Sequence, residues 1–367
     1  MTAHLDRTAL VHPAGARSVR GLRPVLRLAA ELDELAAATG TPLTASGAWL
    51  RTCLDGGATP WAVTVHEPDG RLAAALVLLD VVREPLTMLA ATVDGHCVAV
   101  TSRNGAATTA LAEVLRDQVR RRQDAGRRVA LGPLVADENA WQLADALTGL
   151  LTARLCPPVP VVTRDARTAA TAYLSDNMRR TLRKATNRLL SDGRSTTTVF
   201  SADLDEILPV VPFMLQAHRE RDHEGGRRSP LDDAAGEAAW RRRLTLLLGA
   251  GLLETALLRI DGEPAAYVLA LPDVPSYRIL EGRFATRFAR YSPGRLLEAA
   301  GLQRTLDDPR FTELDWMTPV GSETLLVFND EREAIMLSAD QGGPAGPSVV
   351  PRPRDEGPYD AAAPSLG

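Results

Sequence analysis

The chain has 367 residues, of which 45% are hydrophobic and 24% charged, a composition typical of globular proteins and unlike that of disordered ones. This length allows two domains of ordinary size, each with its own core. The net charge of −4 argues against a surface that binds nucleic acid as a whole. No apolar run reaches the roughly 18–20 residues of a membrane span, and the N-terminus lacks a secretory signal, so we expect a cytoplasmic protein without a membrane partner.

The cysteines give no sign of cross-links or metal. Cys53, Cys97 and Cys156 are odd in number and widely spaced, which fits neither a disulfide framework nor a zinc cluster. We therefore expect three small core residues and no metal site.

In chain order, the first half alternates helices and strands. Residues 1–20 are expected to form a flexible arm. Apolar residues three and four apart predict a helix that ends at Gly40. Two strand-like runs flank Pro68-Asp69-Gly70, which is a strong hairpin signal. The remaining expected elements are helices over 46–54, 106–122 and 138–150, and strands over 61–66, 72–82, 86–91, 97–101 and 129–131.

In the second half, the proline-rich segment near residues 157–165 is predicted to be an extended junction. Pro209 and Pro212 must break the helix that follows Asp203. Three strands over 253–260, 265–271 and 276–283 are expected to form a meander. The other expected elements are helices over 175–191, 233–248 and 293–306, and strands at 199–200, 311–317 and 325–328.

The hairpin turn is repeated. Asp69-Gly70-Arg71-Leu72-Ala73-Ala74 returns 192 positions later as Asp261-Gly262-Glu263-Pro264-Ala265-Ala266. Each copy joins two apolar runs and is followed by another strand, a glycine-bearing loop and a helix, so we predict a duplicated α/β unit. The predicted domains are residues 21–160 and 161–338, followed by a disordered tail over 339–367.

The loop before the last predicted helix has the features of a phosphate site. Ser292 is a good N-cap, Pro293 suits the first helical position, and Gly294 permits close approach of a ligand to the backbone. Helix N-termini favour anions, and Arg290 and Arg295 add positive charge on both sides. An ordinary helix start has the same residues, so this loop alone does not decide the question.

The order of motifs resembles the GNAT acyltransferases, and more closely the tandem FemAB-like branch that includes CelD (BioF2-like) acetyltransferase domains. The matching phrases are Tyr173-Leu174-Ser175, the arginine-rich helix that follows it, Ser292-Pro293-Gly294-Arg295-Leu296-Leu297, and Asp315 before the last strands. The resemblance covers about residues 45–335. It implies two tandem GNAT-like domains, each a mostly antiparallel mixed sheet flanked by helices, with acyl-CoA, and acetyl-CoA in particular, as cosubstrate.

Two departures from the family pattern matter. An aromatic residue and a lysine linked to substrate binding are expected where this chain has Thr324-Leu325-Leu326. The loop of the first copy, Arg103-Asn104-Gly105-Ala106, lacks the Ser-Pro pair. We therefore expect the first domain to have lost the acyl donor.

The predicted helix over 175–191 carries a row of cations. Like charges four residues apart are unfavourable unless an anion lies beside them. The row is either a solvated face or an anion site for the 3′-phosphate of CoA, a phosphorylated acceptor or a tRNA backbone. Its expected binding residues are Arg180, Arg183, Lys184 and Arg188.

Acyl transfer to an amine requires a neutral amine, an oxyanion donor and a proton for the thiolate. By period two, Tyr277, Ile279 and Glu281 are expected to share one face of their strand, which makes Glu281 a candidate base. Tyr291 is the candidate proton donor, and His218 and Asp315 are alternative bases. The leading hypothesis is an N-acyltransferase that uses acyl-CoA on a small-molecule or peptide amine; the alternatives are an aminoacyl-tRNA-dependent aminoacyltransferase and a non-catalytic GNAT-like binding protein.

Overall fold

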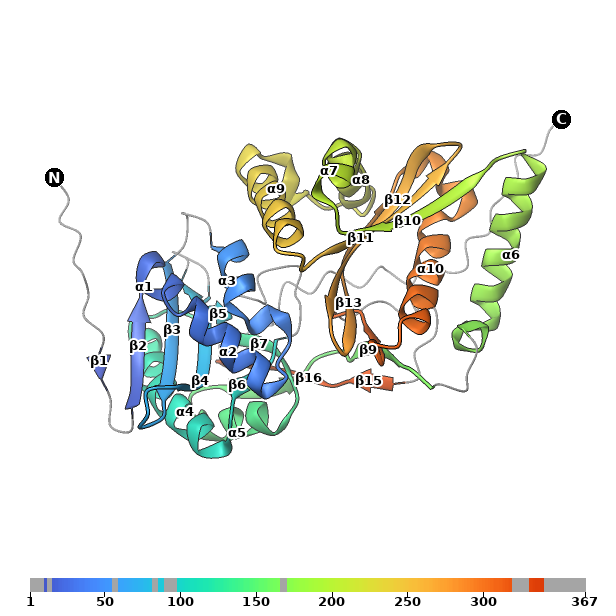
Figure 1. The fold of residues 1–367 in the computed structure, drawn as a ribbon. Coiled ribbons are helices and arrows are strands. Elements are labelled where there is room, and N and C mark those ends of the chain that lie inside the picture. Colours follow the sequence, from blue (N-terminus) through green and yellow to red (C-terminus); the bar gives the residue numbers. More distant parts are fainter. Residues whose placement is uncertain are drawn as a thin grey trace.

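The computed structural model describes residues 10–11, 15–54, 59–80, 85–88, 98–165, 170–318 and 330–339. These residues form two α/β units that lie side by side, each with helices packed against a sheet (Figure 1). The predicted strand over 325–328, Thr324-Leu325-Leu326 and the tail beyond Ala339 lie outside the described residues.

The first unit is built around the predicted hairpin. Strands β3 (Thr59–His66) and β4 (Leu72–Asp80) pair antiparallel, and Gly70 makes the turn with a φ of 87°. The predicted arm over residues 1–20 is wrong in part, because Ala16–Arg20 forms β2 and pairs with β3. The helices of the first unit are α1 (Leu22–Leu26), α2 (Ala29–Thr39), α3 (Gly47–Cys53), α4 (Gly105–Asp124) and α5 (Glu138–Ala146). Its other strands include β5 (Thr87–Met88), β6 (Thr101–Ser102), β7 (Ala130–Val135) and β8 (Thr152–Leu155).

The second unit contains the predicted meander, which the structure confirms. Its four successive antiparallel strands are β10 (Thr196–Ser201), β11 (Glu254–Ile260), β12 (Glu263–Asp273) and β13 (Ser276–Phe284). Helices α8 (Val211–Glu224) and α9 (Ala234–Gly249) cover one face, and α6 (Asp176–Ser191) and α10 (Pro293–Asp307) cover the other (Figure 1). As predicted, the helix after Asp203 is interrupted: α7 (Leu204–Ile207) ends before a short 3₁₀ turn that contains Pro209.

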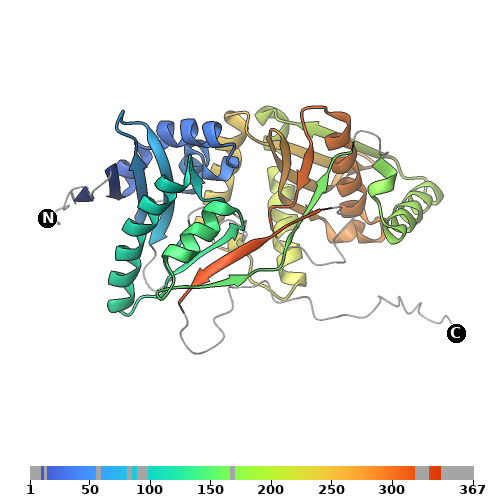
Figure 2. The ribbon, with the colours of Figure 1, turned by 90° about the horizontal axis from the view of Figure 1, so that it is seen from below.

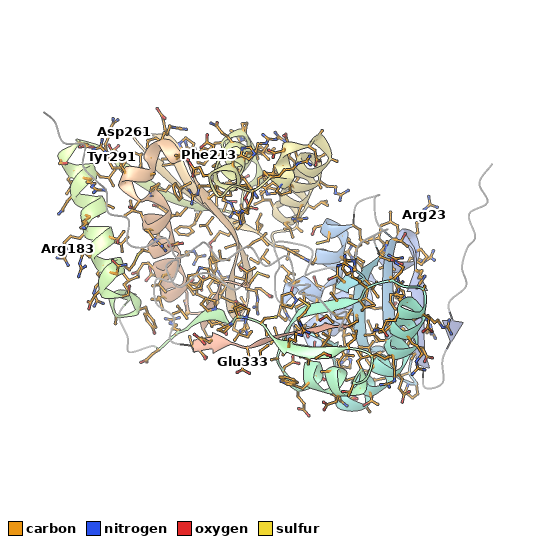
Figure 3. The ribbon with its side chains drawn as sticks, turned by 180° about the vertical axis from the view of Figure 1, so that it is seen from behind. Arg23, Arg183, Phe213, Asp261, Tyr291 and Glu333 are labelled. Atoms are coloured by element: carbon orange, nitrogen blue, oxygen red, sulfur yellow. The ribbon has the colours of Figure 1, made fainter. Side chains whose placement is uncertain are left out.

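The two units exchange strands. The segment near residues 157–165, predicted to be an extended junction, contains the strand β9 (Val159–Thr163), which lies in the second sheet between β14 (Glu313–Asp315) and β15 (Asp330–Arg332). In return β16 (Ala334–Ser338) crosses to the first unit and pairs with β7 and β8 (Figure 2). The predicted second domain, residues 161–338, therefore includes a strand of the first. Figure 3 shows Glu333 at this crossing.

The units also share a core. One cluster of buried apolar side chains contains residues of the first sheet and its helices together with residues of α8, α9 and β12. Polar contacts join the same region: the Leu43 N–H donates to Asp273 Oδ2 at 2.8 Å, and Arg242 Nη2 donates to the Leu54 carbonyl at 3.0 Å. The relative placement of α3 and α9 is thus set by packing as well as by chain connection.

Gly47 gives a test of this packing. A Cβ at Gly47 would lie 1.8 Å from the Ala29 carbonyl oxygen, whereas a Cβ at Gly301 in α10 meets nothing within 4 Å. We expect Gly47→Ala to lower the free energy of unfolding by about 2–3 kcal/mol or more, because backbone cannot move aside. Gly301→Ala should raise it by roughly 0.5–1 kcal/mol. Urea denaturation of both variants checks the contrast, and equal stability would contradict the described contact between α2 and α3.

Candidate active site

A β-bulge in β13 determines where Glu281 points. Leu269 of β12 pairs with Glu281 and the next residue, Ala270, pairs with Ile279, so Leu280 is an extra residue. The prediction that Tyr277, Ile279 and Glu281 share one face is therefore wrong. Tyr277 packs in the cluster beneath α10, whereas Leu280 belongs to the core beneath α8 and α9, where Glu281 also lies.

Three donors hold the buried Glu281 carboxylate. His218 Nδ1 lies 3.2 Å from Oε1, and the Tyr267 hydroxyl donates to the same oxygen. Trp240 Nε1 donates to Oε2 at 3.1 Å. The structure thus brings together two of the four predicted catalytic residues, His218 from α8 and Glu281 from β13. It places Tyr291 and Asp315 elsewhere.

A second carboxylate continues this group outward. Asp222 Oδ2 lies 3.3 Å from His218 Nε2, and Asp222 Oδ1 accepts a hydrogen bond from Arg227 at 3.1 Å. Asp222 is buried while Arg227 is largely exposed. Asp222 was not predicted from the sequence, although its spacing of four from His218 on a helix is a usable signal. Trp240 and Tyr267 come from other elements and give no local signal.

The Glu281 pKa follows from these contacts. Burial raises it, but the hydrogen bond and charge of His218, the charge of Arg283 and the Tyr267 hydrogen bond lower it more, so it falls from 4.5 to about 2. Glu281 is therefore ionised at neutral pH and is a weak base by itself. Its negative charge can instead stabilise a cation or a protonated His218.

The start of α10 differs from the prediction at Ser292. Ser292 occupies the N-cap position as predicted, but it lies in the left-handed region with a φ of 50° and its side chain makes no capping hydrogen bond. Pro293 occupies the first helical position as predicted. A Cβ on Gly294 would lie 3.2 Å from the Phe284 ring, a tight contact that the ring would have to relieve by a small shift. The same end of α4 is closed: Asn104 caps Ala107 N, and Gln142 donates to the Gly105 carbonyl.

Both arginines of the predicted phosphate loop have internal partners. Arg290 Nη2 donates to Asp192 Oδ2 at 2.7 Å, and Arg295 Nη1 donates to the half-buried Glu298 at 3.0 Å. Burial raises the pKa of Glu298, while Arg295 lowers it. An anion at this end would therefore join existing ion pairs rather than meet isolated cations.

Tyr291 does not face Glu281. Its hydroxyl donates to Asp192 Oδ2 at 2.6 Å, at the end of α6, and its ring packs with Leu189. This hydrogen bond and the Arg290 charge lower the pKa of Asp192. Figure 3 shows Tyr291 beside Asp261, away from Phe213 on α8. Through this hydrogen bond Tyr291 anchors the loop before α10 to the end of α6. The contact gives no support to the predicted role of Tyr291 as proton donor.

Asp315 is a structural carboxylate. The side chains of Arg278 and Arg332 both donate to its Oδ2, and the Met317 N–H donates to Oδ1 at 2.7 Å. Only 1% of Asp315 is exposed. Two guanidinium groups and a backbone N–H occupy its oxygens, so the contacts of Asp315 give no support to its predicted role as an alternative base.

The four predicted anion-binding cations are exposed on α6. Arg180, Arg183 and Lys184 form no ion pair within the described part of the chain, and Arg188 Nη1 donates to the Arg290 carbonyl at 2.8 Å. Arg183 points outward from the helix (Figure 3). Through Arg188 this row reaches the loop that precedes α10.

β13 and β14 separate beside this loop. They pair in parallel only over Ser276–Arg278 of β13, and no described strand covers the same edge of β13 from Ile279 to Phe284. The open edge leads directly to the start of α10. Such an edge has backbone N–H groups that can bind a carbonyl oxygen.

Comparison with known proteins agrees with this arrangement. Residues 176–324 match the family model of the acetyltransferase (GNAT) domain. The tandem GNAT protein from the clavulanic acid biosynthesis pathway is similar in fold, with 15% identity, a TM-score of 0.50, and coverage of 88% of this chain and 98% of that one. This is a tandem GNAT-fold protein.

Other solved structures are similar to this chain in fold. FemX has 12% identity and a TM-score of 0.52, with 78% of this chain and 86% of that chain covered. L-PGS from Bacillus licheniformis has 12% identity and a TM-score of 0.50, with 86% and 92% covered. The comparison with curated proteins finds no match. In the described part of this tandem GNAT chain, no helix is long and apolar enough to cross a membrane.

The lowered Glu281 pKa predicts an acid-sensitive fold. Because the folded-state pKa is about 2 and the ordinary value is 4.5, ionised Glu281 stabilises the fold above pH 4.5, and this contribution is lost as pH falls toward 2. We expect the free energy of unfolding to fall by up to about 1.4 kcal/mol per pH unit in that window from this group. Urea denaturation at each pH should show a flatter profile for Glu281→Gln, which is also less stable at pH 7. The exposed control Glu206→Gln should follow the wild type, and a wild-type slope retained in Glu281→Gln would refute the assignment.

Proposed function

We propose that this protein is an N-acyltransferase that transfers an acyl group, acetyl in the simplest case, from acyl-CoA to an amine. The donor lies in the second domain, along the open edge of β13, with its diphosphate at the start of α10. The observation that carries the proposal is the contrast between the two copies. The first turn of α10 has no side-chain cap, whereas α4 is capped by Asn104 and covered by Gln142.

The site supplies three parts of the chemistry. The unpaired backbone edge of Ile279–Phe284 offers N–H groups to the thioester carbonyl, and the start of α10 favours the diphosphate. The amine nitrogen attacks the carbonyl carbon, the C–S bond breaks, and the thiolate leaves with a proton from the amine. Ionised Glu281 stabilises the positive charge that develops on the nitrogen, and His218 beside it is the group that can relay the proton.

The basic row on α6 favours a second candidate, an aminoacyltransferase that takes its donor from aminoacyl-tRNA. Arg180, Arg183 and Lys184 are exposed and have no carboxylate partner within the described residues. A tRNA backbone would neutralise such a row and release counterions, which makes binding steeply dependent on salt. If the donor is acyl-CoA instead, the same cations bind the 3′-phosphate of its single nucleotide.

Calorimetry with CoA and dephospho-CoA tests the proposal. We expect CoA to bind with a Kd in the micromolar range, about −8 kcal/mol. Lys184→Ala should weaken CoA about three- to tenfold, because it removes a cation near the loop that Arg188 contacts. Dephospho-CoA lacks the 3′-phosphate and should bind the wild type and this variant equally. Arg179→Ala, on the same helix but paired with Asp176, is the matched control and should leave CoA binding unchanged.

Other outcomes replace the proposal in defined ways. Heat from charged tRNA but none from CoA, with affinity that falls steeply between 50 and 200 mM salt, would move the donor to aminoacyl-tRNA. Binding of neither would favour a non-catalytic protein. Gly294→Val is a less clean test, because its side chain would meet Phe284 before any ligand.

A further inference from the structure

A small cavity lies beside Glu281, between α9 and the second sheet. Its volume is about 10 Å³, which holds one water-sized group. Leucines form its walls, among them Leu244 and Leu247 of α9 and Leu280 of the bulge. Only three side chains bring polar atoms to it, namely Trp240, Glu281 and Arg243.

Of these three polar side chains, Arg243 is the one whose position no described contact accounts for. Its Nε is buried and has no hydrogen-bond partner, and the guanidinium forms no ion pair within the described residues. Its neighbours on α9 are engaged: Arg241 pairs with Glu237 at 2.8 Å, and Arg242 donates to the Leu54 carbonyl. A partly buried cation without a partner is costly unless a ligand supplies an acceptor.

The negative charge beside the cavity is buried more deeply than the positive charge. Glu281 is buried, with only 4% of its side chain exposed, whereas Arg243 is half-buried. One acceptor site of Glu281 remains, because Oε1 has two donors and Oε2 only one. The cavity thus has room for a primary amine, which is about the size of a water. An anion attached to that amine would lie outside the cavity, on the exposed side of Arg243.

We propose that Arg243 binds a carboxylate of the acceptor, so that the acceptor class is an amine that also carries a carboxylate, such as an amino acid. This inference rests on the proposed function for the acylation of the bound amine, but the binding of the amine does not depend on it. Arg243 would select among amines without touching the reacting atoms. Its guanidinium suits a carboxylate because the two can form paired hydrogen bonds.

The test measures binding without any acyl donor. Calorimetry compares L-alanine with ethylamine, which lacks the carboxylate, and with propionate, which lacks the amine. The wild type should bind L-alanine at least tenfold more tightly than either analogue. Arg243→Gln should abolish the preference for L-alanine over ethylamine and leave ethylamine binding unchanged. Arg241→Gln, two residues away and exposed, should behave like the wild type.

The outcomes separate this inference from the proposed function. Equal binding of L-alanine and ethylamine by the wild type, or a preference that survives in Arg243→Gln, overturns the role of Arg243. A preference that depends on Arg243, in a protein that fails to bind CoA, supports the inference and sets aside only the acyl-CoA donor. Thermal denaturation of Arg243→Gln confirms that a lost preference does not come from unfolding.

Discussion

One extra residue in β13 determines which face of the second sheet carries the buried charge. Without the bulge at Leu280, alternation would put Glu281 with Tyr277 beneath α10. With it, Glu281 meets His218 and Trp240 on the other face. Glu281 therefore belongs to the Ile279–Phe284 stretch of β13 that β14 leaves uncovered, and in the proposed reaction the amine and the thioester meet along this stretch.

An ionic network joins β13, β14 and β15 at the end of β13 opposite that open edge. Asp315 of β14 accepts from Arg278 of β13 and from Arg332 of β15, so the three strands are tied at one end only. Arg278 also donates to Asp273 at 3.0 Å, and Asp273 accepts the Leu43 N–H of the first unit. Such buried pairs specify geometry more than they add stability. Asp315 is thus a positioning residue for the edge, which explains why it resembles a site residue without being free to act as a base.

The sequence predicted what depends on local pattern. Period-two and helical patterns placed the meander, the hairpins and the main helices, and Ser175 caps α6 as expected. It did not predict β9 and β16 in exchanged sheets, because strand partners are chosen by tertiary packing. The bulged residue Leu280 is neither proline nor glycine, and Gly282 two positions later was not taken as a bulge signal, so the face of Glu281 was misassigned. The loop residues Arg290, Ser292 and Tyr291 were placed correctly at the helix start. The partner of Arg290 and Tyr291, however, is Asp192 at the end of α6, about 100 positions away in sequence.

The two copies differ at equivalent places, and the differences point the same way. Trp49 of α3 and Trp240 of α9 occupy related helices 191 positions apart, close to the repeat offset. Trp240 Nε1 donates to Glu281, whereas Trp49 Nε1 has no partner among the described residues. The helix starts diverge likewise, since α4 is capped by Asn104 and α10 is not. The first copy thus has a capped helix and an indole N–H without a described partner, whereas the second copy has the uncapped helix start and the Trp240–Glu281 hydrogen bond, and the two copies are joined through the shared core.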